Sequence, residues 1–537
     1  MNIEITAGPL RSHIVQHAWL PPDQQAALRE ELSATVPGAH YVTAALAAKQ
    51  MEGESDSDST EGWDGVYRLL TKAGRFPAGL TDRVTRWLQD KGHWVTVTNQ
   101  LPHYTPDSPP VAWSGTLDPE QEEAVQALLA TKRGMVSAPP RSGKTLIAAE
   151  AIRRAGVFPA VFLLERLDIA QPPRGAVTKF QDYFGDTLKI GWAYDGQVEV
   201  GDIMVVTVQT ACQAIQQKLE LTDDDIPEDE LDQTGKAVLL DVLHKARLVY
   251  TDEGHHLAAP TYRAVLREMK QREYCWSGSG TPYRDDNLDL LMEGACGPIV
   301  HTITRQQMIR RNRLVPAHIY LAQMPHKEYK RGAAFPTRRA DYIHRNPIRN
   351  KAIVEFVQMM VSKQLSVMVI CDHTVQVRII HNHLKTARID HVCMAASGKY
   401  ATEPRDRQDV WDDLQEKKNL VVVTTLGQEG LDVPSMAGVV IAAGGASSVR
   451  AMQRFRCMTA WPGKDACYVL DFVDDAKYFE AHSKDRLRMY MTEPPGVFYI
   501  HHVTQYMEVS GSVERWLHSH RVWDDIVKEA KEKGQPS

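Results

Sequence analysis

A short apolar strand followed by a glycine-containing loop and a helix constrains the fold of this chain more than any other feature. Gly134 to Ser137 is apolar, the loop Ala138-Pro-Pro-Arg-Ser-Gly143 follows, and Lys144-Thr145 opens an apolar helical stretch. Such a loop points backbone N–H groups and a helix N-terminus at phosphate oxygens. The segment therefore predicts a P-loop on an α/β sheet, with ATP as the nucleotide.

The residue types in this loop suggest their roles. We expect Lys144 to reach the β and γ phosphates and Thr145 to bind the accompanying Mg²⁺. Ala138 stands where the strict pattern has its first Gly, and a Gly-Lys-Thr also occurs in chance loops. The residues expected around the phosphates are Pro139, Pro140, Arg141, Ser142, Gly143, Lys144 and Thr145.

A second apolar strand ends in two adjacent acids. Leu248 to Thr251 runs directly into Asp252-Glu253. We expect Asp252 to hold Mg²⁺ through water, and Glu253 to orient and deprotonate the attacking water in phosphoryl transfer. An acidic turn after a strand is the alternative, but the position of the pair beyond Lys144 favours catalysis.

The hydrophobic pattern divides the chain into five parts. Short runs rich in Val, Ile and Leu alternate with helical stretches over 111–300 and over 346–485, as buried parallel strands do. We predict an α+β accessory or DNA-binding unit over 1–105, a basic connector over 301–345 and a tail over 486–537. The expected fold class is therefore α/β, with two similar lobes after an N-terminal unit.

Composition and charge limit the class of protein to which this chain can belong. The net charge is −6, so contacts with nucleic acid must come from local basic surface, for which 301–345 is the best candidate. The seven cysteines show no C-x-x-C pair and no zinc spacing, which predicts unpaired thiols in a reducing compartment. No signal peptide and no apolar run of about 18 residues is present, so we expect a cytoplasmic protein of a bacterial or phage-infected cell, without a membrane partner.

Further segments resemble, in order, the motifs of superfamily 2 helicases of the DExH kind over roughly residues 117–475. This resemblance implies two tandem RecA-like (P-loop) lobes. It also implies that Gln121 recognises the adenine base of ATP. Ser279-Gly280-Thr281-Pro282 matches the motif that couples the ATP site to nucleic acid, and Gly430 and Asp432 belong to the fifth motif, at the nucleotide. The residues that the resemblance assigns to coupling or nucleic-acid contact are Arg166, Thr207, His255, Ser279, Thr281 and Thr425.

The sixth motif departs from the family pattern. The segment begins Gln453-Arg454-Phe455-Arg456, which implies catalytic roles for Gln453, Arg454 and Arg456 at the γ-phosphate. However, Cys457 and Ala460 occupy the two positions of the family's later arginines. Whether Arg454 or Arg456 substitutes for them stays open. Loss of such an arginine lowers hydrolysis on the order of a thousandfold or more.

The N-terminal part narrows the expected substrate. Trp63 to Leu70, followed by Phe76 to Leu80, resembles the leader domain of UvsW-type phage helicases, although the Trp also suits a buried anchor. That resemblance implies an ATP-dependent DNA helicase or translocase acting on single-stranded and branched DNA, including forks, Holliday junctions and R-loops with their RNA–DNA hybrids, in recombination, replication or repair. The alternatives are the motor subunit of a restriction or repair complex, and an ATP-gated DNA clamp or annealing protein. The sequence leaves protein partners open.

Overall fold

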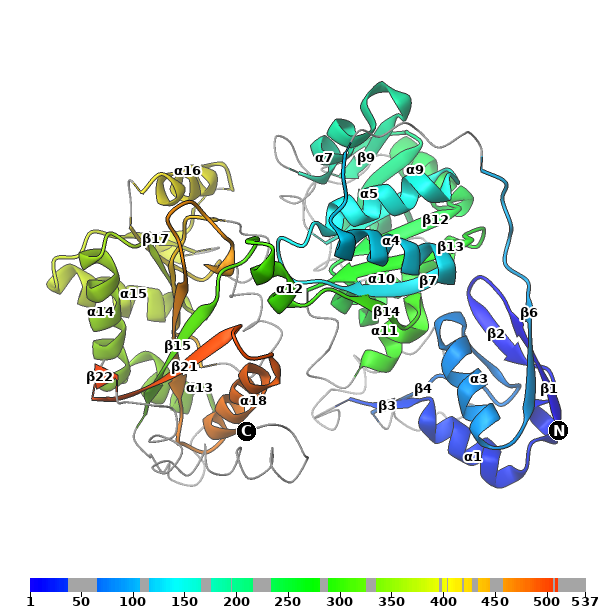
Figure 1. Cartoon of the computed structure of the whole chain (residues 1–537), viewed down its shortest axis with the longest axis horizontal. Helices are drawn as coiled ribbons and strands as arrows, with labels where there is room; N and C mark the ends of the chain where they lie inside the picture. The colour runs from blue at the N-terminus through cyan, green and yellow to red at the C-terminus, as the bar shows by residue number, and fades with distance from the viewer. Residues whose placement is uncertain are drawn as a thin grey trace. The chain divides into compact units, whose positions relative to one another are not determined.

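The computed structural model of the chain is shown in Figure 1. It describes residues 1–36, 65–106, 115–165, 175–194, 196–215, 233–280, 288–324, 335–395, 398–402, 404–417, 420–426, 433–444, 457–505 and 508–509. The chain divides into unit 1, Met1–Ile303, and unit 2, Thr304–Ser537. Within the described ranges each unit carries an eight-stranded, mainly parallel sheet, so the predicted α/β fold is confirmed.

The N-terminal part of unit 1 combines two small sheets with two α-helices. Its larger sheet has the order β5-β2-β1-β6, in which only the β1–β6 pair is parallel, and β3 pairs with β4. The elements are β1 (Asn2–Ala7), β2 (Arg11–Ile14), α1 (Pro22–Glu31), β3 (Ser33–Thr35), β4 (Val66–Arg68), β5 (Arg75–Pro77), α3 (Thr81–Asp90) and β6 (Trp94–Asn99).

The main sheet of unit 1 has the order β10-β9-β11-β8-β12-β13-β7-β14, and every pair except β10–β9 is parallel. Two central strands are buried at every residue, as strands covered on both faces must be. The strands are β7 (Arg133–Ser137), β8 (Ala160–Leu164), β9 (Ile190–Tyr194), β10 (Gln197–Glu199), β11 (Ile203–Thr207), β12 (Leu248–Asp252), β13 (Tyr274–Ser279) and β14 (Ile299–Thr302).

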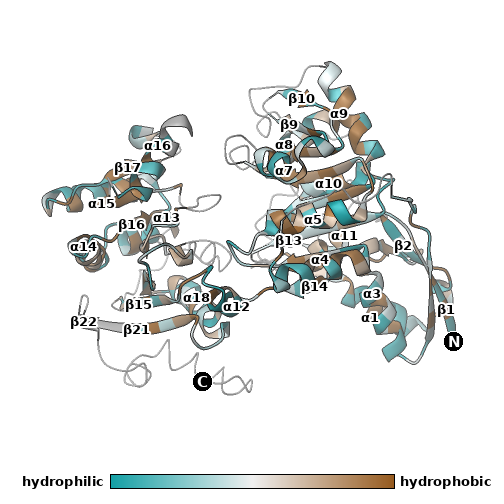
Figure 2. Cartoon of the chain, turned by 45° about the horizontal axis from the view of Figure 1, so that its top comes forward, coloured by the Kyte–Doolittle hydropathy of each residue, from teal (hydrophilic) through white to brown (hydrophobic). Residues whose placement is uncertain are grey.

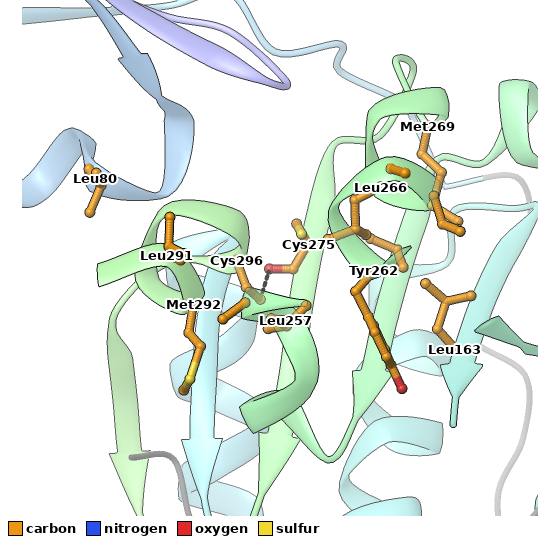
Figure 3. Close-up of a cluster of buried hydrophobic side chains, with 14 of the residues drawn as sticks. Leu80, Leu163, Leu257, Tyr262, Leu266, Met269, Cys275, Leu291, Met292 and Cys296 are labelled. Atoms are coloured by element: carbon orange, nitrogen blue, oxygen red, sulfur yellow. Dashed lines mark hydrogen bonds between the residues drawn. The ribbon is translucent and has the colours of Figure 1, made fainter. Parts of the chain in front are cut away.

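Helices cover both faces of this sheet. On one face, Phe162 of β8 makes ring contacts with Tyr250 of β12 and with Phe180 of α7. On the other face, Leu163 belongs to a cluster with Leu257 and Leu266, drawn in Figure 3. The helices are α4 (Pro119–Thr131), α5 (Lys144–Ala155), α7 (Ala176–Phe184), α8 (Val208–Ile215), α9 (Gln233–Lys245), α10 (Pro260–Glu268) and α11 (Asp289–Cys296).

The N-terminal part packs against α11. Leu80 faces Leu291 in the same apolar cluster (Figure 3). Arg83 holds Glu293 of α11 at 2.6 Å, between Nη2 and Oε2. A side chain at Gly79 would place its Cβ 2.0 Å from the backbone oxygen of Glu293, so the two backbones approach as closely as only glycine permits. These contacts join the N-terminal part to the main sheet of unit 1.

Unit 2 repeats the architecture with the strand order β17-β18-β16-β19-β20-β15-β21-β22, in which only the β21–β22 pair is antiparallel. Its strands are β15 (Ala317–Gln323), β16 (Val367–Ile370), β17 (Val392–Met394), β18 (Val421–Thr424), β19 (Gly438–Ile441), β20 (Cys467–Val473), β21 (Phe498–Gln505) and β22 (Glu508–Val509). Its helices are α12 (Arg305–Arg310), α13 (Phe335–Arg339), α14 (Pro347–Ser362), α15 (Thr374–Thr386), α16 (Pro404–Gln415) and α18 (Phe479–Thr492).

Two stretches differ from their sequence-based interpretation. The predicted connector 301–345 contains β15, which lies between β20 and β21 inside the sheet of unit 2. The predicted tail 486–537 contains β21, which pairs with β15 along most of its length. Ile319 and Leu321 are buried between less buried neighbours, and this short alternation is obscured by the basic residues around it.

Hydropathy follows the layers of each unit. Figure 2 shows hydrophobic residues along the strands and hydrophilic residues on many outward helix faces. None of the helices in the described ranges has both the length and the apolar character that crossing a bilayer requires.

Candidate active site

Parallel pairing brings the predicted ATP-site residues of unit 1 to one edge of the sheet. Ser279 at the end of β13 pairs with Ser137 at the end of β7, immediately before the P-loop. Asp252 at the end of β12 pairs with Gly278 of β13. Because the carboxyl ends of parallel strands meet at a common edge, this edge is where α/β sheets bind ligands.

Gly143 has a conformation and an environment that only glycine suits. It is the N-cap of α5 in the left-handed region, with φ +81°. A Cβ there would lie 2.4 Å from Nε2 of Gln121, which donates a 2.8 Å hydrogen bond to the backbone oxygen of Ser142. Gln121 also caps α4, since its Oε1 accepts from the backbone N–H of Asp118 at 2.9 Å. The predicted adenine-reading residue therefore holds the P-loop in place.

The remaining loop residues are placed by the same turn. Arg141 adopts a left-handed backbone with φ +66°, and the backbone N–H of Ser142 donates to the oxygen of Pro139 at 3.3 Å. Pro140 is partly buried, and Thr145 lies in the first turn of α5 beside Lys144. Lys144 and Thr145 therefore open the helix whose N-terminus faces the loop.

Lys144 and Ser142 make the loop suitable for a polyphosphate. Nζ of Lys144 lies 3.7 Å from Oε1 of Glu253 and 3.5 Å from the backbone oxygen of Ala138. The hydroxyl of Ser142 is buried and has no hydrogen-bond partner among the described residues. A buried donor without a partner is costly in a folded protein unless a ligand satisfies it. These groups therefore fit an anionic ligand held by the loop.

The two acids at the end of β12 lie in different environments. Burial, followed by the neighbouring charge of Glu253, raises the pKa of Asp252 to about 6, and the ammonium of Lys144 opposes this rise. Glu253 adopts a left-handed backbone with φ +48°, which costs energy for a residue with a side chain. This strained turn places its carboxylate beside Lys144.

A chain of polar contacts leads from Glu253 to the predicted coupling motif. Nδ1 of His255 lies 3.5 Å from Oε2 of Glu253 and 3.2 Å from Oγ of Ser279. Both His255 and Ser279 are buried. His256 lies 2.8 Å from a carboxylate oxygen of Glu165, at the end of β8. Glu165 directly precedes Arg166, one of the predicted nucleic-acid contacts.

Two other predicted contact residues have defined surroundings. The hydroxyl of Thr207 is buried and lies 2.8 Å from that of Thr210, so it fixes the first turn of α8. In the same segment Gln209 is exposed, and it is the side chain available to an external ligand. In unit 2, the backbone N–H of Thr425 donates to the oxygen of Met394 at 3.3 Å.

Part of the predicted site lies outside the described residues, and these predictions stay untested. They concern Arg166, Thr281, Gly430, Asp432, Gln453, Arg454 and Arg456.

Cys457, which directly follows Arg456, lies within the described residues. It is buried, and its Sγ lies 3.5 Å from that of Cys467. The backbone N–H of Ala460 donates to the oxygen of Arg313 at 3.0 Å. Cys457 therefore packs into the core of unit 2.

Comparison with known proteins agrees with the motif order. Residues 114–284 match the family described as type III restriction enzyme, res subunit. A curated relative, "Putative helicase 22" of Sulfolobus islandicus filamentous virus (isolate Iceland/Hveragerdi), is 26% identical over 282 residues, which make up 49% of this chain and 49% of the relative. The chain thus spans about half the length of that relative.

A solved restriction-enzyme structure shares the fold of much of this chain. A fragment of a type I restriction enzyme subunit of the HsdR kind from Vibrio vulnificus YJ016 is 15% identical, with 75% of this chain and 71% of that chain covered and a TM-score of 0.51. UvsW of phage T4 is 16% identical, with 94% of this chain and 99% of that chain covered and a TM-score of 0.39. The ordered motifs, the family match and the viral relative together indicate that the chain resembles superfamily 2 helicases.

Proposed function

We propose that this protein is an ATP-dependent DNA helicase or translocase that remodels branched DNA such as forks, Holliday junctions and R-loops. The observation that carries the proposal is the common edge of β7, β12 and β13, where the P-loop, Asp252 and Glu253 meet. This arrangement supplies both a phosphate-binding loop and a carboxylate pair, as phosphoryl transfer to water requires.

Each residue of this edge has a distinct role in the proposed hydrolysis of ATP. Lys144 binds the β and γ phosphates, and Ser142 donates its buried hydroxyl to the same group. Glu253 accepts a proton from the attacking water, since its carboxylate lies beside Lys144. Thr145 and Asp252 would hold Mg²⁺, which neutralises phosphate charge when it is bound.

The proposed coupling between ATP and nucleic acid runs through His255. Its ring lies between the carboxylate of Glu253 and the hydroxyl of Ser279, so a shift of the carboxylate during hydrolysis changes the contact with Ser279. Ser279 directly precedes the segment that carries Thr281, which the family resemblance assigns to coupling. Such a chain of contacts transmits a small change at the phosphate to the nucleic-acid contacts.

The N-terminal part supports the preference for branched DNA. It packs on α11, which covers the main sheet of unit 1, so it is positioned to follow the movements of that sheet. Two of its aromatic side chains are strongly exposed, Trp19 at 74% and Trp94 at 80%. Exposed aromatic rings stack on unpaired bases irrespective of sequence, and a branch point offers such bases.

A substrate panel tests this proposal. ATP hydrolysis and strand separation are measured on single strands, duplexes, forks, Holliday junctions and RNA–DNA hybrids. We expect branched substrates to be processed fastest, and Trp94→Ala to lower their processing while leaving hydrolysis in the absence of DNA unchanged. Trp94→Phe is the matched control and retains activity because it keeps a stacking ring. Equal processing of forks and plain duplexes would contradict the preference.

The motor subunit of a restriction or repair complex is a second candidate, and the family match to a restriction enzyme subunit favours it. Such a motor translocates along duplex DNA without separating the strands. Displacement of a third strand from a linear triplex, together with no unwinding of forks, would support this function instead of the first.

An ATP-gated clamp or annealing protein is the third candidate. It is favoured by the buried position of Cys457, which replaces one of the family's arginines. Arg454→Ala and Arg456→Ala, assayed separately, identify the residue that assists hydrolysis. Absence of turnover in the unmodified protein at saturating DNA, with normal ATP binding, would support the clamp.

A further inference from the structure

Two histidines and a cysteine of unit 2 converge at a site far along the chain from the ATP-site motifs. His381 lies on α15, Cys393 lies on β17, and His391 lies on the short segment between them. One ligand atom from each residue lies within 4.8 Å of the other two. All three side chains are partly exposed, so an ion from solvent has access to them.

The distances between the ligand atoms are close to those of a tetrahedral metal site. Sγ of Cys393 lies 3.6 Å from Nδ1 of His381, and that nitrogen lies 2.9 Å from Nε2 of His391. With zinc at about 2.05 Å from nitrogen and about 2.3 Å from sulfur, tetrahedral geometry places N and S about 3.6 Å apart and two nitrogens about 3.4 Å apart. A movement of about half an ångström between the rings brings the two nitrogens to tetrahedral spacing. The remaining pair, Cys393 and His391, has its ligand atoms within 4.8 Å of each other.

The hydrogen bonds fix the correct tautomer of His391. Its Nδ1 lies 2.7 Å from the backbone oxygen of Ile389 and therefore donates to it. This bond leaves the lone pair of Nε2 directed at His381, and metal-binding histidines commonly have such a carbonyl partner on the other nitrogen. Without an ion, the proton on Nδ1 of His381 bridges the two rings; a metal ion takes the place of that proton.

The electrostatic surroundings favour the neutral ring that a metal requires. Burial, followed by the neighbouring charges of His391, Lys385 and Lys399, lowers the pKa of His381. Burial raises the pKa of the Cys393 thiol to about 11, so binding of an ion must displace the thiol proton.

We propose that His381, His391 and Cys393 form a Zn²⁺ site that ties α15 to β17. Two imidazole nitrogens and one thiolate are a donor set that zinc accepts, with water in the fourth position. In the described part of the sheet, β17 is an edge strand next to β18 alone. The ion fixes this edge to the neighbouring helix, which Figures 1 and 2 both show beside β17. Because two of the three ligands are histidines, the spacing of the cysteines alone does not indicate this site.

Cobalt binding to the full-length, chelator-treated protein tests the proposal without ATP or DNA. We expect one equivalent of Co²⁺ to produce a thiolate-to-metal charge-transfer absorption, and Zn²⁺ to remove it by displacement. The other six cysteines are buried, which makes Cys393 the accessible thiol. We also expect Zn²⁺ to raise the midpoint of thermal unfolding.

Two variants and a matched control decide the assignment. Cys393→Ser and His391→Gln are expected to abolish the absorption and the thermal shift. His383→Gln changes an exposed histidine on the same helix and is expected to retain both. No charge-transfer absorption at saturating Co²⁺, or its persistence in Cys393→Ser, would overturn the proposal. Because every readout is independent of hydrolysis, a failure here leaves the proposed function unaffected.

Discussion

The charge of Asp252 should destabilise the folded protein when no ligand is bound, and Asp252→Asn tests this. Burial and the charge of Glu253 raise the pKa of this carboxyl from its ordinary 3.8 to about 6. Asparagine has nearly the same shape but no charge. We therefore expect the variant to be more stable than the natural protein at neutral and alkaline pH, although it loses the carboxylate that the proposed hydrolysis needs.

The sign and size of this effect follow from linkage. A carboxyl with a raised folded-state pKa binds protons more tightly in the folded state, so its ionisation destabilises the fold as pH rises from about 4 to about 6. Above pH 6 ionisation of Asp252 lowers the free energy of unfolding by its full amount. This is about 3 kcal/mol for a pKa raised from 3.8 to about 6. At pH 5 the same relation gives about half of that cost.

Thermal unfolding of the ligand-free protein at pH 8 and pH 5 measures the difference. We expect Asp252→Asn to raise the midpoint at pH 8 by about 3–6 °C, and by roughly half as much at pH 5. Equal midpoints for the two proteins at pH 8, or an equal gain at both pH values, would refute a buried, ionised Asp252 as the cause.

Three further predictions concern the same edge of unit 1. Gly143→Ala is expected to destabilise the protein by about 1–2 kcal/mol in urea unfolding and to weaken ATP binding, because of the positive φ and the 2.4 Å approach of the added Cβ to Gln121. Gly280→Ala is the control: its Cβ would meet nothing closer than 3.6 Å, so it should behave like the natural protein in both assays. Gln121→Ala should raise the KM for ATP several-fold through loss of its bond to the P-loop, whereas Gln126→Ala, on an exposed part of the same helix, should leave KM unchanged. At limiting Mg²⁺, hydrolysis should fall as pH drops through about 6, with about tenfold less ionised Asp252 at pH 5 than at full ionisation; a flat profile between pH 5 and 8 would contradict the raised pKa.

Local signals in the sequence were sufficient to predict the elements that form the candidate ATP site. The strand, loop and helix around Lys144 form from consecutive residues, and so do β12 and its terminal acids. Their spatial meeting also follows from the sequence, because parallel strands present their carboxyl ends at one edge. The α/β class was predictable for the same reason.

Features that depend on distant pairing were not predictable. The strand β15 pairs with β20 and β21, which follow it far along the chain, so its surroundings are decided by residues remote in sequence. Likewise, the residues around Gln121 predict only a position at the start of a helix. Its hydrogen bond to the backbone oxygen of Ser142 depends on how α4 packs against the P-loop. The ligands His381 and Cys393 become neighbours only when α15 packs beside β17.

The most direct test of the account is phosphate release from ATP, with and without single-stranded DNA, by the natural protein, Lys144→Ala and Glu253→Gln. We predict DNA-stimulated hydrolysis by the natural protein and a decrease on the order of a hundredfold or more in each variant, with unchanged circular dichroism. Natural rates of hydrolysis in either variant would contradict the assignment of this edge as the catalytic site.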